Sequence, residues 1–236
     1  MRFGNHKTVG QDPNYFSLLE AMNADGCVVC RLADRQLERI IDSLRYERID
    51  DYEIRRKIHQ SGGFCREHAL RILEQGDPLL HAIIYSRLFE QKVETLRSGE
   101  DIASRRSSSD GRKRFGAREG LRAPNGSECL ICEGLRELED RVLPLIPMFY
   151  DCDETFRKAF DERGHLCVPH LEAVFSKSKP DASPNGILSA QIRKYDQLAR
   201  HLREIERKFD YRYCNETSCE DEKKAWRLAV ALWTGC

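Results

Sequence analysis

The feature that most constrains this chain is a metal-ligand pattern that occurs twice with the same spacing. In each copy a Cys-x-x-Cys is followed, after 34 intervening residues, by a Cys-x-x-His. Every member of the second copy lies 102 positions after its counterpart in the first. The eight residues are Cys27, Cys30, Cys65, His68, Cys129, Cys132, Cys167 and His170. A doubled set at one fixed offset predicts two metal sites in an internally duplicated protein.

The repeat extends beyond these eight residues. Residues 27–73 align without a gap on residues 129–175. The identical pairs outside the ligands are Arg39 with Arg141, Asp51 with Asp153, Arg55 with Arg157, and Gly62 with Gly164. Apolar character is also kept at positions three, four and seven apart, which is the spacing of one helix face. We therefore expect two pseudo-symmetric helical repeats that arose by duplication.

Each repeat is expected to contain four helices. The expected ranges are 27–48, 50–61, 65–75 and 78–98 in the first copy, and 129–150, 153–163, 167–176 and 187–209 in the second. Pro144 and Pro147 should kink or break the helix in which they lie. Further helices are expected at 13–24 and 219–233. No sustained alternation indicates a strand, so the predicted fold class is all-α.

The domain organisation follows from the repeats. We expect a first metal-binding repeat over 1–98, a flexible basic linker over 99–126, a second repeat over 127–210, and a C-terminal helical segment over 211–236. The linker is rich in Ser, Gly and Arg, a composition that does not bury enough apolar surface to fold. Trp226 and Trp233 share a face of the last helix, which predicts that they pack on the core.

Three thiolates and one imidazole form a good tetrahedral ligand set for zinc. Ligands three residues apart at a helix start would sit near the positive end of the helix dipole, which favours thiolate over thiol. We expect two zinc ions per chain in closed, structural sites. The spacing leaves the pairing open: each ion could join the two motifs of one repeat, or the Cys-x-x-Cys of one copy could join the Cys-x-x-His of the other.

Other readings of the same residues are an iron–sulfur cluster, a dithiol redox pair, or ordinary buried side chains without metal. Covalent haem requires His directly after Cys-x-x-Cys, and Arg31 and Glu133 stand there instead. His165 lies close to the second Cys-x-x-His and is a candidate outer contact of that site. The remaining cysteines are either a third site or free thiols; they are Cys152, Cys214, Cys219 and Cys236.

Composition narrows the function classes. Lys plus Arg equals Asp plus Glu at 39 each, so no global field attracts nucleic acid or anionic membrane. The N-terminus has no signal-peptide pattern and no run of apolar residues is long enough to span a bilayer, so a cytoplasmic location is expected. No catalytic motif is visible. These observations favour a non-catalytic scaffold or adaptor for a protein partner; an enzyme, or a redox or metal-handling protein, stays open.

Several segments resemble an uncharacterised prokaryotic domain-of-unknown-function family. They are the two Cys-x-x-Cys motifs, the Gly63–His68 segment GFCREH, the Gly164–Cys167 segment, and the closing KFDYRY and DEKKAWRLAVAL. The resemblance covers about Cys27 to Trp233. Some members of that family carry the label of ABC transporter substrate-binding protein, which fits poorly with a chain without an export signal. The resemblance implies no activity.

Overall fold

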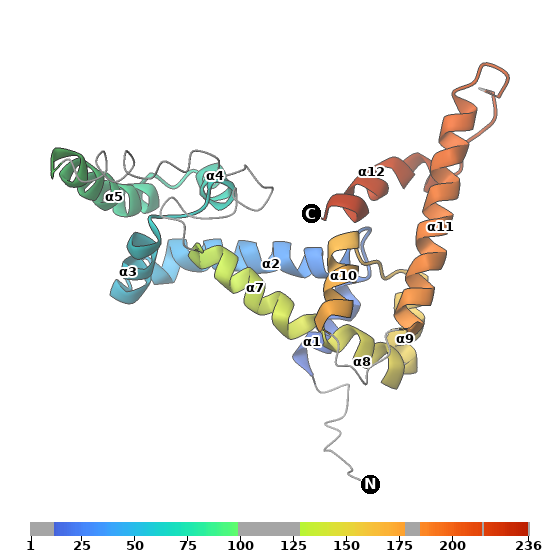
Figure 1. Cartoon of the computed structure of the whole chain (residues 1–236), viewed down its shortest axis with the longest axis horizontal. Coiled ribbons are helices and arrows are strands. Elements are labelled where there is room, and N and C mark those ends of the chain that lie inside the picture. Colours follow the sequence, from blue (N-terminus) through green and yellow to red (C-terminus); the bar gives the residue numbers. More distant parts are fainter. Residues whose placement is uncertain (1–11, 99–127, 178–184, 214, 236) are drawn as a thin grey trace, which may run out of the picture. The chain divides into compact units, whose positions relative to one another are not determined.

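The computed structural model describes residues 12–98, 128–177, 185–213 and 215–235. The expected linker at 99–126 therefore lies outside the described residues, as do Cys214 and Cys236. Within the described part the fold is all-α, as predicted, with no strand (Figure 1). One isolated parallel β-bridge pairs Cys27 with His165.

The helices follow the expected order closely. Those of the N-terminal half are α1 (Pro13–Ala21), α2 (Val28–Ser43) with a π-helical turn (Leu44–Arg48), α3 (Tyr52–Ser61), α4 (Arg66–Glu74) and α5 (Pro78–Ser98). Those of the C-terminal half are α7 (Leu130–Val142), α8 (Leu145–Cys152), α9 (Glu154–Glu162), α10 (Val168–Lys177), α11 (Asn185–Lys208) and α12 (Glu220–Thr234). The break between α7 and α8 falls at Pro144, as predicted from the missing backbone N–H of proline.

The chain forms two compact units whose limits differ from those of the sequence repeats. The first unit joins Met1–Arg35 to Leu138–Cys236, and the second is Gln36–Glu137. Helices α2 and α7 each contribute residues to both units. The division into consecutive repeats remains a prediction about the sequence, because the compact units are not consecutive segments. The pseudo-symmetry likewise remains a prediction.

The core of the first unit is built around aromatic side chains. Phe149, Phe156 and Phe160 are fully buried. Tyr15 packs edge-on against Phe149, with ring centroids 5.3 Å apart, and donates a hydrogen bond of 2.9 Å to Asp153. These contacts fix α1 on α8 and α9, in the same unit as α10, α11 and α12.

The second unit has a smaller aliphatic core. Leu44, Ile58, Leu80, Ile84 and Ile131 are its largest fully buried side chains. They come from the π-helical turn after α2, from α3 and α5, and from the start of α7. Two metal-ligand motifs, which begin at Cys65 and Cys129, share this core.

Identical residues of the repeat hold helix ends. Asp51 and Asp153 are the N-caps of α3 and α9, and each side chain accepts a hydrogen bond from a backbone N–H of the first turn. Gly62 ends α3 in the left-handed conformation with φ of 78°. Gly164 does not: its φ is not positive, and its small size is needed because an added Cβ would lie 2.6 Å from the Phe160 ring.

The prediction for the C-terminal tryptophans is wrong. Trp226 is 53% exposed and Trp233 is 75% exposed. Helix α12 instead buries Ala225 and Leu232 and packs against α11 and α10. The helix has two apolar faces, and the smaller side chains occupy the buried one.

Candidate metal centres

The eight residues of the doubled pattern come together in two groups of four, and each group combines the two repeats. The first-unit cluster is Cys27, Cys30, Cys167 and His170; the second-unit cluster is Cys65, His68, Cys129 and Cys132. In each cluster one ligand atom per residue lies within 4.8 Å of all the others. The alternative in which one ion joins both motifs of one repeat is therefore not the arrangement of this structure.

The backbone around the first-unit cluster holds the two motifs together. The amide of Val28 donates a hydrogen bond of 2.9 Å to the carbonyl of His165, next to the Cys27–His165 bridge. This contact places the start of α2 against the segment that leads into α10. His165 thus acts through its backbone, and the structure does not make its side chain a ligand.

Every ligand pair opens a helix, as predicted. Cys27 and Cys129 immediately precede α2 and α7, and Cys65 and Cys167 immediately precede α4 and α10. The carbonyl of each of these four cysteines accepts the first backbone hydrogen bond of its helix, at 2.8–3.1 Å. The amide of Cys132 in addition donates to the Cys129 sulfur at 3.4 Å. Two positive helix ends therefore face each cluster.

The four donor atoms of the first-unit cluster lie close enough together for one metal ion to contact all of them. The His170 Nδ1 atom lies 3.0 Å from the Cys167 sulfur and 3.4 Å from each of the Cys27 and Cys30 sulfurs. The Cys30 and Cys167 sulfurs are 3.8 Å apart. A zinc ion with Zn–S bonds of about 2.3 Å at the tetrahedral angle separates two sulfurs by about 3.8 Å.

The second-unit cluster has nearly the same dimensions. The His68 Nδ1 atom lies 3.2–3.4 Å from the sulfurs of Cys65, Cys129 and Cys132. The Cys132 sulfur is 3.8 Å from that of Cys65 and 3.3 Å from that of Cys129. The four donors of the second-unit cluster therefore also lie close enough together to hold a metal.

Both clusters are closed by the protein. Cys27, Cys65, Cys129 and Cys167 have no exposed surface, and His68 is 4% exposed. Cys132 and His170 are half-buried. With four protein donors and little access for solvent, neither cluster offers the open position that a catalytic metal needs.

The electrostatics of the second-unit cluster favour a bound cation. The hydrogen bond between the Cys129 and Cys132 sulfurs is the main cause that lowers the pKa of the Cys129 thiol to about 3, against the opposing effect of burial, and the hydrogen bond between Cys129 and His68 adds to it. The hydrogen bond with Cys129 and burial both raise the pKa of the Cys132 thiol. One buried thiolate is thus stabilised by hydrogen bonds from its neighbours, and a bound metal ion would stabilise all four donors in the same way.

One contact of the first-unit cluster was missed by sequence reasoning. The Glu139 carboxylate lies 3.4 Å from Nε2 of His170, on the side of the ring away from the sulfurs. Burial alone would lower the pKa of His170, but the three sulfurs and Glu139 raise it well above its usual range. A carboxylate on the far nitrogen orients a metal-ligating imidazole. The corresponding position of the first repeat is Leu37, so the repeat itself gave no signal for this contact.

The described cysteines outside the pattern do not join either cluster. Cys152 and Cys219 are exposed.

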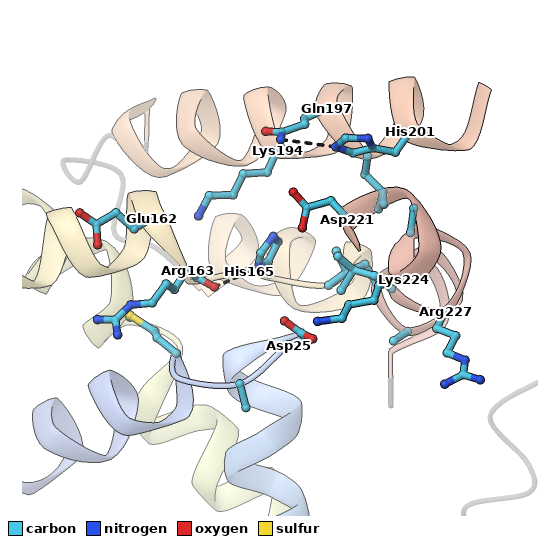
Figure 2. Close-up of a pocket in the computed structure, with 18 of the residues that line it drawn as sticks. Asp25, Glu162, Arg163, His165, Lys194, Gln197, His201, Asp221, Lys224 and Arg227 are labelled. Carbon is cyan, nitrogen blue, oxygen red and sulfur yellow. Dashed lines mark hydrogen bonds between the residues drawn. The ribbon is translucent and has the colours of Figure 1, made fainter. Parts of the chain in front are cut away.

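A separate cavity of about 780 Å³ lies between α11, α12 and the turn before α10, and Figure 2 shows His165, Lys194 and His201 along its wall. The Lys194 ammonium donates hydrogen bonds to the backbone carbonyls of Phe160 and Gly164, and it thereby caps the C-terminal end of α9.

Comparisons with known proteins place the whole pattern in one family. The sequence profile described as "Family of unknown function (DUF6062)" matches residues 16–234. The chain is also similar to an "Uncharacterized 23.9 kDa protein in xynA 3'region" of Caldicellulosiruptor sp. (strain Rt8B.4), with 31% identity over 218 residues, which are 92% of this chain and 99% of that protein. No solved structure matches. None of the described helices has the length and apolar character needed to cross a membrane.

Proposed function

Because the chain belongs to a family of unknown function, DUF6062, we propose a function from its own geometry: a non-catalytic zinc protein that serves as a helical scaffold or adaptor for a protein partner. The observation that carries this proposal is the pair of buried Cys3His clusters, in each of which four donors lie close enough together for one ion to contact them all. In the proposed state, two zinc ions are bound by the eight residues of the doubled pattern.

The ions would have a structural task. Cys27 and His170 are 143 positions apart in the chain, and Cys65 and Cys132 are 67 apart. A tetrahedral ion joins these distant helix starts and offsets the entropy of closing the intervening chain. In small metal-dependent domains such binding contributes roughly 10 kcal/mol or more to folding. The second unit has the smaller core, so its stability should depend more strongly on metal binding.

An exposed apolar face supports the adaptor part of the proposal. Trp226, Val230 and Trp233 of α12 are 53%, 61% and 75% exposed, and their spacing of four and three places them on one side of the helix. Tryptophan dominates the binding energy of many protein interfaces, and a helix with such a stripe fits the groove of a partner protein.

Elemental analysis and an absorption spectrum of anaerobically purified, untagged protein test the metal part. The expected result is about two zinc ions per chain and a flat visible spectrum. Cys65→Ser should lose one ion together with helicity, whereas Cys152→Ser, which changes an exposed cysteine outside both clusters, should keep both. Iron with sulfide and a coloured spectrum would replace the proposal with the electron-transfer or sensing alternative.

Chemical cross-linking in cells of the source organism tests the adaptor part. A specific partner should be recovered with the wild-type protein and lost with Trp226→Lys. Tyr46→Lys is the matched control, because Tyr46 is 74% exposed but belongs to the second unit. Equal recovery with Trp226→Lys and with the wild type would exclude this face as the contact.

A further inference from the structure

A third group of metal-ligand side chains lies where α11 meets the start of α12. His201 comes from α11, Cys219 is the N-cap of α12, and Glu222 is in the first turn of α12. One nitrogen, one sulfur and one oxygen of these side chains lie within 4.8 Å of one another. All three belong to the first unit and none belongs to the doubled pattern. Sequence reasoning considered Cys219 only with other cysteines and did not connect it to a histidine.

The local structure of α12 prepares two of the donors. As the N-cap, Cys219 stands at the positive end of a helix of 15 residues. Glu222 follows three positions later and therefore lies on the same side of the first turn. The third donor comes from a different helix, so the group is not a property of the α12 terminus alone. His201 is half-buried, and its Nε2 atom lies 3.5 Å from the side-chain nitrogen of Gln197 (Figure 2).

The carboxylate of Glu222 is held in place by a lysine. Lys208 Nζ contacts one oxygen of Glu222 at 2.5 Å, and both side chains are only 12% exposed. Hydrogen bonds from outer groups commonly orient ligating carboxylates. The positive charge of Lys208 also opposes a nearby cation, so an ion here must be bound more weakly than in the two closed clusters. Cys219 is an exposed residue, so the position is accessible from solvent.

From this geometry we propose that His201, Cys219 and Glu222 form a third, exchangeable site for a transition metal ion such as zinc. Mixed nitrogen, sulfur and oxygen donors suit zinc and cobalt rather than magnesium or calcium. Three protein donors leave a coordination position free, in contrast to the four donors of each closed cluster. The site goes beyond the proposed scaffold function, because it would let the protein take up and release a metal ion while its structural ions stay bound.

Titration with Co²⁺ tests the site in the full-length protein after loosely bound metal has been removed with a mild chelator. The wild-type protein should take up one further Co²⁺ per chain and develop a near-ultraviolet thiolate-to-cobalt charge-transfer band. Cys219→Ser should abolish that band, and both Cys219→Ser and His201→Gln should weaken the further uptake at least about tenfold, since even outer contacts of metal sites contribute that much. Circular dichroism of Cys219→Ser should show unchanged helicity, because Cys219 is an exposed residue.

Cys152→Ser is the matched control, because it also removes an exposed thiol of the first unit. It should keep both the further ion and the band. Absence of a further Co²⁺ in the wild type, or equal uptake by Cys219→Ser and the wild type, would overturn the proposal. The outcome does not depend on which metal the closed clusters hold, because only the additional equivalent and its dependence on Cys219 are measured.

Discussion

Two double variants distinguish pairing between the repeats from pairing within them. Cys65→Ser with Cys129→Ser removes two donors from the second-unit cluster and leaves the first-unit cluster intact. Cys65→Ser with Cys27→Ser instead removes one donor from each cluster. Under pairing within a repeat the consequences would be reversed, because Cys27 and Cys65 would then share one ion.

The expected difference is one metal ion per chain. Structural zinc binds with roughly 10–16 kcal/mol at neutral pH, so even a quarter of the lower value for one lost donor weakens binding about fiftyfold or more. Against a chelator that leaves the wild type fully loaded, the Cys65/Cys129 variant should keep about one ion and the Cys65/Cys27 variant none.

Elemental analysis after dialysis against such a chelator gives the number of metal ions per chain. Hydrogen exchange shows which helices are destabilised. In the Cys65/Cys129 variant, backbone amides of α3, α4 and α5, which belong to the Gln36–Glu137 unit, should exchange faster, whereas those of the first unit should not. One ion retained by the Cys65/Cys27 variant and none by the Cys65/Cys129 variant would refute the pairing of this structure.

Three single substitutions test other parts of the argument. Glu139→Gln should lower the metal affinity of the His170 site about 10- to 100-fold, measured by chelator competition; an unchanged affinity would show that the 3.4 Å contact does not orient the ring. Gly164→Ala should destabilise the protein by about 1–3 kcal/mol in urea unfolding, since its Cβ would lie 3.0 Å from the Phe160 backbone; an unchanged midpoint would count against this close approach. Burial and a carboxylate neighbour raise the pKa of Tyr15 to about 12, so its contribution to stability is present below pH 10 and is lost as the pH rises through about 12. In Tyr15→Phe the free energy of unfolding should not show that part of the decrease at alkaline pH. Parallel curves of stability against pH for the two proteins would contradict this prediction.

Much of the fold was predictable because helices are encoded locally. Apolar spacing gave the helices, and α5 has the limits that were predicted for it. Pro144 marked a break because proline has no N–H to donate. Asp51 and Asp153 matched in the repeat because each caps a helix with its own side chain. Each of these signals acts over a few residues and is therefore visible in the chain.

The contacts that depend on packing were not predictable. Trp226 and Trp233 share a face, and periodicity cannot distinguish the buried apolar face of α12 from the exposed one. Glu139 has Leu37 as its counterpart in the repeat, so its contact with His170 arises only from the way α7 approaches α10. His201 and Cys219 likewise meet only because α12 packs back on α11.

The sequence by itself determined which eight side chains gather and that each pair opens a helix, because spacing within a helical turn fixes donors on one side of it. It left undetermined which pairs meet. Tertiary structure decided that, joining Cys27 to His170 and Cys65 to Cys132 across the repeats. The physical reason is that both pairings use identical local motifs, and the selection between them comes from packing: the start of α2 is buried in one core and the start of α7 in the other.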